Sequence, residues 1–350
     1  MNFERAMYAS IGPLRRWLLG CLCLVVIGCA ALGNRSGTAP RRPSAIVDPP
    51  APLGAPTLLI ALPNSPTFLA VRKSLVSEVR KNFKVQTVIV TPETTANDLG
   101  SAIEHAAPAC IVLMNNPTMG LLSEYERQRP ALQFPPTVLL MASLVEAVQP
   151  LLKNATGIAY EVPGVIAFVN LRAIINAPVR RVGVVYRPNF RKLVERQIVL
   201  AGKEHIELIA VPLSNEVSLT SLRNALETLV AGHVDAVWML NDNVLVRDSE
   251  LRDDAWRAVV TEAKLPLVVG AANLINPSSP LGTLAVVPDH EALGLQAANL
   301  IFELQDDAWK VHGKAVELPL SVKTLVDLKT ARDSFGLRAT AGDHIDRALE

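Results

Sequence analysis

The chain has 350 residues, half of them hydrophobic, which is enough for two domains of ordinary size with substantial cores. Its 34 basic residues nearly balance its 33 acidic residues, and aromatic residues make up 5% of the sequence. Nucleic-acid binding usually needs a basic excess, and single-strand binding needs aromatic stacking platforms. We therefore expect no nucleic acid partner.

A short apolar run near the N-terminus follows three arginines and contains Cys21, Cys23 and Cys29. The uncharged stretch 17–32 has 16 residues, fewer than the roughly 20 that span a bilayer. Residues Val26-Ile27-Gly28-Cys29 resemble the lipobox of bacterial lipoproteins. The resemblance implies a signal peptide over 1–28 and a mature chain that begins at a lipidated (palmitate-carrying) Cys29. The alternative is an uncleaved membrane anchor.

The lipoprotein interpretation gives a location. A chain of this kind is anchored by its lipid in the bacterial cell envelope and faces the periplasm. Ala30 follows the lipidated cysteine, and by the enterobacterial sorting rule a residue other than Asp favours the outer membrane. After cleavage only Cys110 remains besides the lipidated one, so we expect no internal disulfide and a buried thiol.

Six prolines lie between residues 34 and 56. Proline removes backbone donors and favours extended structure, so residues 29–56 are expected to be a tether.

From Thr57 onward, short apolar runs alternate with segments of helical spacing. Leu75, Val79 and Phe83 recur every four residues, as on one face of a helix. Strands separated by helices favour parallel sheets. The predicted strands are Thr57–Leu62, Val85–Val90, Ala109–Met114, Thr137–Met141, Thr156–Glu161, Arg181–Tyr186, Ile206–Val211, Ala236–Leu240, Leu267–Gly270 and Thr283–Val287.

Two sets of about five strands predict an α/β fold with two Rossmann-like lobes, each a parallel sheet flanked by helices. The N-terminal lobe is expected over 57–160 plus 288–318. The C-terminal lobe is expected over 161–287 plus 319–338, and a tail over 339–350. Ligands of such sheets bind at the carboxyl ends of the strands.

Small polar and aromatic residues follow several predicted strands, where they would line a cleft between the lobes. Each polar one is also an ordinary helix cap or turn former. The candidate ligand-binding residues are Asn64, Ser65, Asn116, Thr118, Ser143, Tyr160, Tyr186, Asp242 and Asn273.

Sequence patterns of common enzymes are missing: there is no GxSxG, no phosphate-binding GxxxxGK, no GxGxxG and no HExxH. The six histidines are scattered without metal-ligand spacing. We therefore expect no catalytic residue, no metal and no cofactor. A hydrolase triad assembled from distant residues is the enzyme alternative.

Five stretches resemble, in order, those of ABC transporter substrate-binding proteins of the family with tryptophan- and tyrosine-binding members. The first stretch reads Asn-Ala-Thr-Gly-Ile, and the second begins with Arg-Arg-Val-Gly-Val-Val-Tyr. The five stretches lie at residues 154–158, 180–189, 234–243, 282–294 and 325–337. The resemblance covers about residues 105–338 and implies the type I periplasmic binding protein fold with a hinge. The loops after the third and fourth strands depart from the family pattern, at Asn115-Asn116-Pro117-Thr118 and Ala142-Ser143-Leu144, as does Ala159-Tyr160.

The resemblance implies a lipid-anchored, monomeric solute-binding protein. Such a protein captures a small molecule, such as an amino acid or a related metabolite, and delivers it to an ABC permease. The altered loops favour a changed ligand or its loss. The alternative is therefore an envelope lipoprotein that keeps the fold in a structural, sensory or regulatory role.

Overall fold

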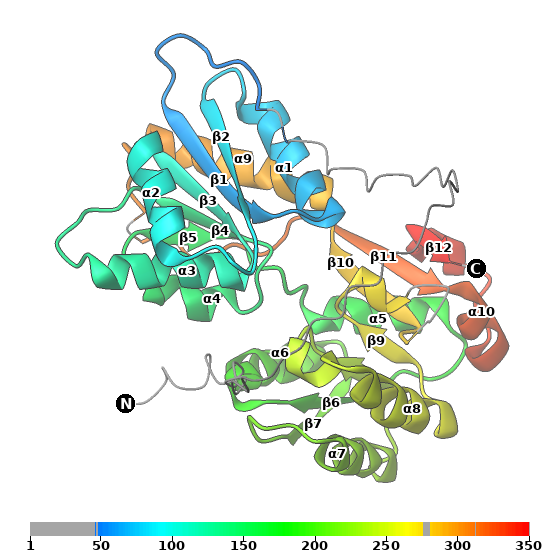
Figure 1. The fold of residues 1–350 in the computed structure, drawn as a ribbon. Coiled ribbons are helices and arrows are strands. Elements are labelled where there is room, and N and C mark those ends of the chain that lie inside the picture. The colour runs from blue at the N-terminus through cyan, green and yellow to red at the C-terminus, as the bar shows by residue number, and fades with distance from the viewer. Residues whose placement is uncertain (1–45, 47, 276–280, 312, 350) are drawn as a thin grey trace, which may run out of the picture. The chain divides into compact units, whose positions relative to one another are not determined.

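The computed structural model describes residue 46 and residues 48–275, 281–311 and 313–349 (Figure 1). The predicted signal peptide, the lipidation site Cys29 and most of the predicted tether lie outside the described residues. From Asp48 onward the chain forms one compact unit. Asp48, within the predicted tether, accepts hydrogen bonds from the backbone N–H and the hydroxyl of Thr87 at 2.9 and 2.6 Å, and pairs with Arg72.

The first sheet has five parallel strands in the order β2-β1-β3-β4-β5 (Figure 1). Its central strand β3 is an apolar run that is buried along its whole length, because helices cover both faces of a parallel sheet. The strands are β1 (Thr57–Pro63), β2 (Lys84–Val90), β3 (Cys110–Met114), β4 (Thr137–Leu140) and β5 (Ala155–Gly157).

Four helices connect these strands and a fifth arrives from later in the chain. The last of them packs along the first so closely that a Cβ on Gly294 would lie 2.6 Å from the Val71 carbonyl oxygen. The helices are α1 (Pro66–Val79), α2 (Ala96–Ala106), α3 (Asn116–Gln128), α4 (Val145–Val148) and α9 (His290–Asp306).

The second sheet has seven strands in the order β12-β11-β10-β9-β8-β6-β7, and only β10 and β11 pair antiparallel. The strands are β6 (Arg181–Tyr186), β7 (Glu207–Pro212), β8 (Ala236–Met239), β9 (Leu267–Val269), β10 (Leu284–Pro288), β11 (Val322–Asp327) and β12 (Arg347–Leu349). Residues 339–350, expected as a tail, thus contribute an edge strand that pairs with β11.

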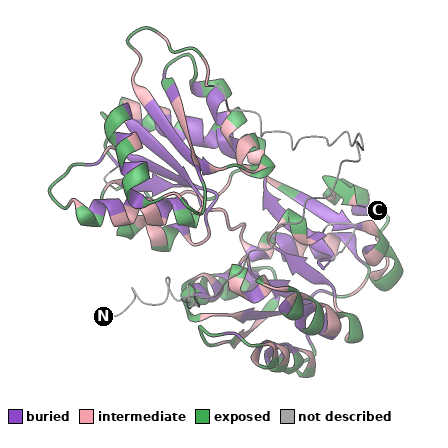
Figure 2. Cartoon of the chain, in the orientation of Figure 1, coloured by how far each residue is buried: buried purple, intermediate pink, exposed green. Residues whose placement is uncertain are grey.

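Helices flank this sheet as well. They are α5 (Gly164–Ile174), α6 (Arg191–Lys203), α7 (Leu219–Ala231), α8 (Ala258–Glu262) and α10 (Leu328–Thr330), with π-helical turns at Leu251–Arg257 and Ala331–Phe335. Figure 2 shows the same division in both sheets: buried strands lie between helices whose outer faces are exposed. The predicted α/β fold with two lobes of mostly parallel strands is therefore confirmed.

Each sheet has its own core on either face. Cys110 lies at 0% exposure in the first sheet, and burial raises the pKa of its thiol to about 12. The thiol is therefore an inert core group, as expected. The domain limits given above stay a prediction.

The chain passes between the two sheets three times, at 158–163, at Asp289 and at 315–321. The first and third passages run side by side. The Ala159 N–H donates to the Glu317 carbonyl at 2.8 Å, and the Glu317 N–H donates to the Gly157 carbonyl at 2.9 Å. These three segments connect the two lobes.

Among the described residues, no helix combines the length and the apolar character that crossing a membrane requires.

Candidate functional site

The loop after β4 is fastened to its neighbours by its own polar groups. The Asn116 amide donates to the Ser143 carbonyl at 2.8 Å and accepts from the Ser143 N–H at 2.9 Å. The Ser143 hydroxyl donates to the Asn241 carbonyl, at the end of β8, at 3.2 Å. Two predicted ligand residues thus bond each other, and one of them bonds the second lobe.

Thr118 is fully buried and acts as part of a helix cap. Its N–H and hydroxyl both donate to the side-chain oxygen of Asn115, at 2.9 and 2.8 Å. Asn115 precedes α3 with φ 79° and ψ 158°, a backbone conformation that residues other than glycine rarely adopt. Asn115 is therefore the N-cap of α3, and Thr118 supplies the donors that it accepts.

Asp242 forms a buried ion pair at the end of β8. The Arg187 guanidinium donates to both of its carboxylate oxygens at 2.7 Å, and the Val244 N–H donates to one of them at 3.0 Å. The Asp242 side chain is only 3% exposed. Its carboxylate is thus paired within the chain and caps the following turn, which is the alternative role given above for such strand-end residues.

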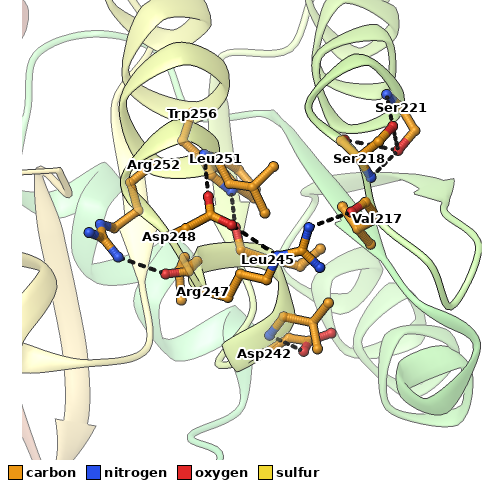
Figure 3. A network of polar contacts seen from close by, with 12 residues as sticks. Val217, Ser218, Ser221, Asp242, Leu245, Arg247, Asp248, Leu251, Arg252 and Trp256 are labelled. Atoms are coloured by element: carbon orange, nitrogen blue, oxygen red, sulfur yellow. Dashed lines mark hydrogen bonds and ion pairs between the residues drawn. The ribbon is translucent and has the colours of Figure 1, made fainter. Parts of the chain in front are cut away.

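The segment that follows Asp242 takes part in a network of polar contacts (Figure 3). The Trp256 indole N–H donates to the Leu245 carbonyl at 2.9 Å, and the Arg247 guanidinium donates to the Val217 carbonyl at 3.1 Å. The Asp248 carboxylate accepts from the Leu251 N–H at 2.9 Å. These bonds connect residues 245–248 to Val217 and to the π-helical turn at Leu251–Arg257.

Tyr160 lies on the first passage between the sheets and stacks on His290 at the start of α9. The ring centroids are 6.1 Å apart, and the Tyr160 hydroxyl lies 3.1 Å from the His290 Nε2 atom. Burial raises the Tyr160 pKa to about 12 and lowers the His290 pKa. The ring that Tyr160 contacts here belongs to the chain itself.

The remaining four candidate residues are at least partly exposed. Asn64 and Asn273 are exposed, and Ser65 and Tyr186 are partly exposed. Ser65 occupies the N-cap of α1 without a side-chain capping bond. The ligand-binding role of all nine candidate residues stays a prediction.

A small cavity lies at the strand ends of the second sheet, beside Tyr160, Trp238, Asn241 and Gly270. Its volume is about 30 Å³. A water molecule or two would fill it, whereas metabolite sites usually measure hundreds of cubic ångströms.

A much larger cavity, of about 630 Å³, lies between α4 of the first lobe and α6 of the second. Ala159, Val162 and Val316, from the passages between the sheets, also line it. We call it the α4/α6 cavity. Its lining is Leu144, Val145, Glu146, Ala147, Ala159, Glu161, Val162, Pro163, Asn189, Lys192, Leu193, Arg196, Gln197, Leu200, Val316 and Leu318.

Glu161 places a carboxylate where the two cavities meet, since it lines both. The residue as a whole is half-buried, but desolvation of its carboxyl group raises the pKa. Glu146 raises that pKa further, while the Leu144 N–H, which donates to the Glu161 carboxylate at 2.7 Å, and the Arg196 guanidinium lower it. A carboxylate in this position is well suited to a cationic partner.

Gln197 lines the α4/α6 cavity from the second lobe and is 3% exposed. Its side-chain oxygen is buried without a hydrogen-bond partner, among the described residues the single buried side-chain atom of this kind. Sequence reasoning missed both Gln197 and Glu161. Gln197 follows the charged residues Glu195 and Arg196 on a helix and is typical of a surface position, while Glu161 was assigned to the end of a predicted strand.

No group of histidine, cysteine and carboxylate side chains within the described ranges is arranged to hold a metal ion.

Comparison with known proteins adds the fold family. No protein-family model matches the chain, and no curated protein is a significant match in sequence. Solved structures do match. A substrate-binding protein with adhesive properties from Clostridium difficile, in its ligand-free open form, superposes with a TM-score of 0.63 at 14% identity, covering 85% of this chain and 99% of its own.

Two further structures match over a similar extent. A domain from Streptococcus pneumoniae in complex with L-Trp has a TM-score of 0.55 at 14% identity, covering 84% of this chain and 100% of its own. A conserved domain protein from Vibrio cholerae has a TM-score of 0.54 at 17% identity, covering 84% of this chain and 99% of its own. The chain therefore has the two-lobed α/β fold of the substrate-binding proteins of ABC transporters.

Proposed function

We propose that this protein is a lipid-anchored solute-binding protein that captures a small molecule between its lobes for an ABC-type importer. The α4/α6 cavity carries the proposal, because it is lined from both lobes and its 630 Å³ fall within the range of small-molecule sites. The fold supports the proposal, as do the binding roles of its structural neighbours.

Binding would act on the equilibrium between an open and a closed arrangement of the lobes. Few polar contacts join α4 and its preceding loop to the second lobe, among them Ser143 to Asn241 and the ion pair between Glu146 and Arg196 at 2.9 Å. An exposed ion pair of this kind contributes little, about 0–1 kcal/mol. A ligand that touches both lobes would therefore shift the population toward closure, which a permease could read.

The test is a melting-temperature screen of the full-length chain against amino acids, amines, sugars, nucleosides and carboxylates. A ligand that binds the folded state alone at 100 times its Kd stabilises it by about 2.7 kcal/mol, so its melting temperature must rise. Ala147→Trp enlarges a residue that lines the α4/α6 cavity. If this variant abolished the shift in melting temperature, the ligand would be located in that cavity. A panel that moves no melting temperature would contradict the proposal.

The alternative is an envelope lipoprotein with a structural, sensory or regulatory role. It is favoured by the bonds that Asn116, Ser143 and Asp242 make within the chain, because these occupy groups that a ligand would need. Under this alternative Ala147→Trp would leave the protein's envelope function intact, and no metabolite would raise its melting temperature.

A further inference from the structure

We propose that the α4/α6 cavity selects a ligand with an apolar body and a cationic amine, held by Glu161 and Gln197. This inference rests on the proposed function, because it names the ligand class of the same interlobe site. Three independent features of the cavity support it: an unpaired buried amide, a desolvated carboxylate and an apolar wall.

The unpaired amide is the first feature. A buried polar atom without a partner is unfavourable by about as much as a lost hydrogen bond, and native proteins contain few. Gln197 has such an atom and lines the cavity. The amide oxygen lacks a donor, and a ligand N–H in the cavity would supply one.

The carboxylate is the second feature. Glu161 accepts the Leu144 N–H at its carboxylate, and among the described residues no cation forms an ion pair with it. The nearest cation, Arg196, is itself paired with Glu146 at 2.9 and 3.2 Å. Lys192, also at the cavity, is exposed. A ligand ammonium with three N–H donors could pair with the Glu161 carboxylate and still reach a second acceptor.

The apolar wall is the third feature. Ten of the lining residues have side chains without polar groups, and they come from both lobes and both neighbouring passages: Leu144, Val145, Ala147, Ala159, Val162, Pro163, Leu193, Leu200, Val316 and Leu318. Such a wall favours a hydrophobic body and disfavours a sugar, which would leave several hydroxyls without partners. Apolar body and amine together define the ligand class.

The test uses pairs of probes that differ only at the amine. Tryptamine and tyramine carry an ammonium where tryptophol and tyrosol carry a hydroxyl, and indole-3-propionate presents a carboxylate. Calorimetric titration of the full-length chain should show each amine binding at least about tenfold more tightly than its alcohol, which is the scale of one good ion pair. The carboxylate should bind most weakly.

Two variants and a control assign the roles. Glu161→Gln keeps the acceptor for the Leu144 N–H but removes the charge, so it should abolish the preference for amine over alcohol. Gln197→Met should weaken the binding of amines while raising the melting temperature of the free protein, since it removes the unpaired atom. If Gln197 had only a structural role, the substitution would lower both the affinity for amines and the melting temperature. Glu195→Gln, on the exposed side of α6, should change neither.

The outcomes distinguish the amine inference from the solute-binding proposal. Equal or tighter binding of the alcohols or the carboxylate, or amine binding that Glu161→Gln leaves unchanged, would overturn the amine inference. If another class of metabolite stabilises the chain while no amine binds, the inference fails and the solute-binding proposal stands. If nothing in either experiment binds, both fail.

Discussion

At the residue scale, the sequence predicted where polar side chains lie at the strand ends. It did not predict which groups they bond to. The sequence places Asn116, Ser143 and Asp242 after their strands, because parallel strands end where their loops begin. Whether such a group faces a ligand or a neighbouring loop depends on distances of an ångström or two between segments far apart in sequence. Asp242 illustrates this, because its partner Arg187 follows a different strand.

Gln197 gives a direct test at this scale. Gln197→Met should stabilise the ligand-free protein by about 1–3 kcal/mol, since an apolar side chain of similar volume replaces a buried amide oxygen without a partner. Denaturant unfolding of the two proteins measures the change. A destabilised variant would mean that the amide has a partner in solution.

Glu161 predicts a pH dependence. Its carboxyl pKa is raised in the folded state above the ordinary 4.5, so the folded state holds the proton more tightly than the unfolded state does. The stabilisation from Glu161 is therefore complete below about pH 4.5 and is lost as the pH rises through the raised pKa. Glu146 and Arg196 face the same carboxyl and act in opposite directions.

Glu161→Gln should consequently be more stable than the parent at pH 7 and equal to it near pH 4, with a difference of at most about 1.4 kcal/mol for each pH unit of raised pKa. Unfolding curves recorded from pH 4 to pH 8 measure it, with Glu195→Gln as the control that follows the parent. A constant difference at every pH would contradict the assigned cause.

At the scale of elements, the ten predicted strands all exist and most have ends within two residues of those expected. Short apolar runs bounded by turn residues are a reliable signal for buried parallel strands. The strand predicted over Thr156–Glu161 is the largest deviation, because β5 ends at Gly157 and the chain then leaves the sheet. β12 has only three residues and depends on an edge that β11 provides, so no local pattern could indicate it.

The packing of α9 on α1 predicts opposite effects for two helical glycines. Gly294→Ala should destabilise the protein by about 1–3 kcal/mol, because the new methyl group would meet backbone atoms of α1. Gly120→Ala, in α3, meets nothing within 4 Å and should stabilise by up to about 1 kcal/mol through helix propensity. Melting curves of both variants measure the difference, and two stabilising results would show that α9 does not contact α1 in this way.

At the scale of the whole molecule, the alternation of strands and helices predicted two lobes, and the family resemblance predicted how they are joined. The structure supports the prediction of two lobes directly. The α4/α6 cavity could not be predicted, because it is formed by the relative placement of α4, α6 and two passages that lie up to 174 positions apart in the chain, from Leu144 to Leu318. Sequence periodicity describes single elements and does not fix such placements.

The claim that a small molecule binds between the lobes is tested most directly by a crystal structure of the protein with the ligand that most raises its melting temperature. We predict electron density for that ligand in the α4/α6 cavity, within hydrogen-bond distance of the Glu161 carboxylate and the Gln197 amide. Ligand density on an outer surface, with the cavity still lined only by the chain's own side chains, would contradict the account.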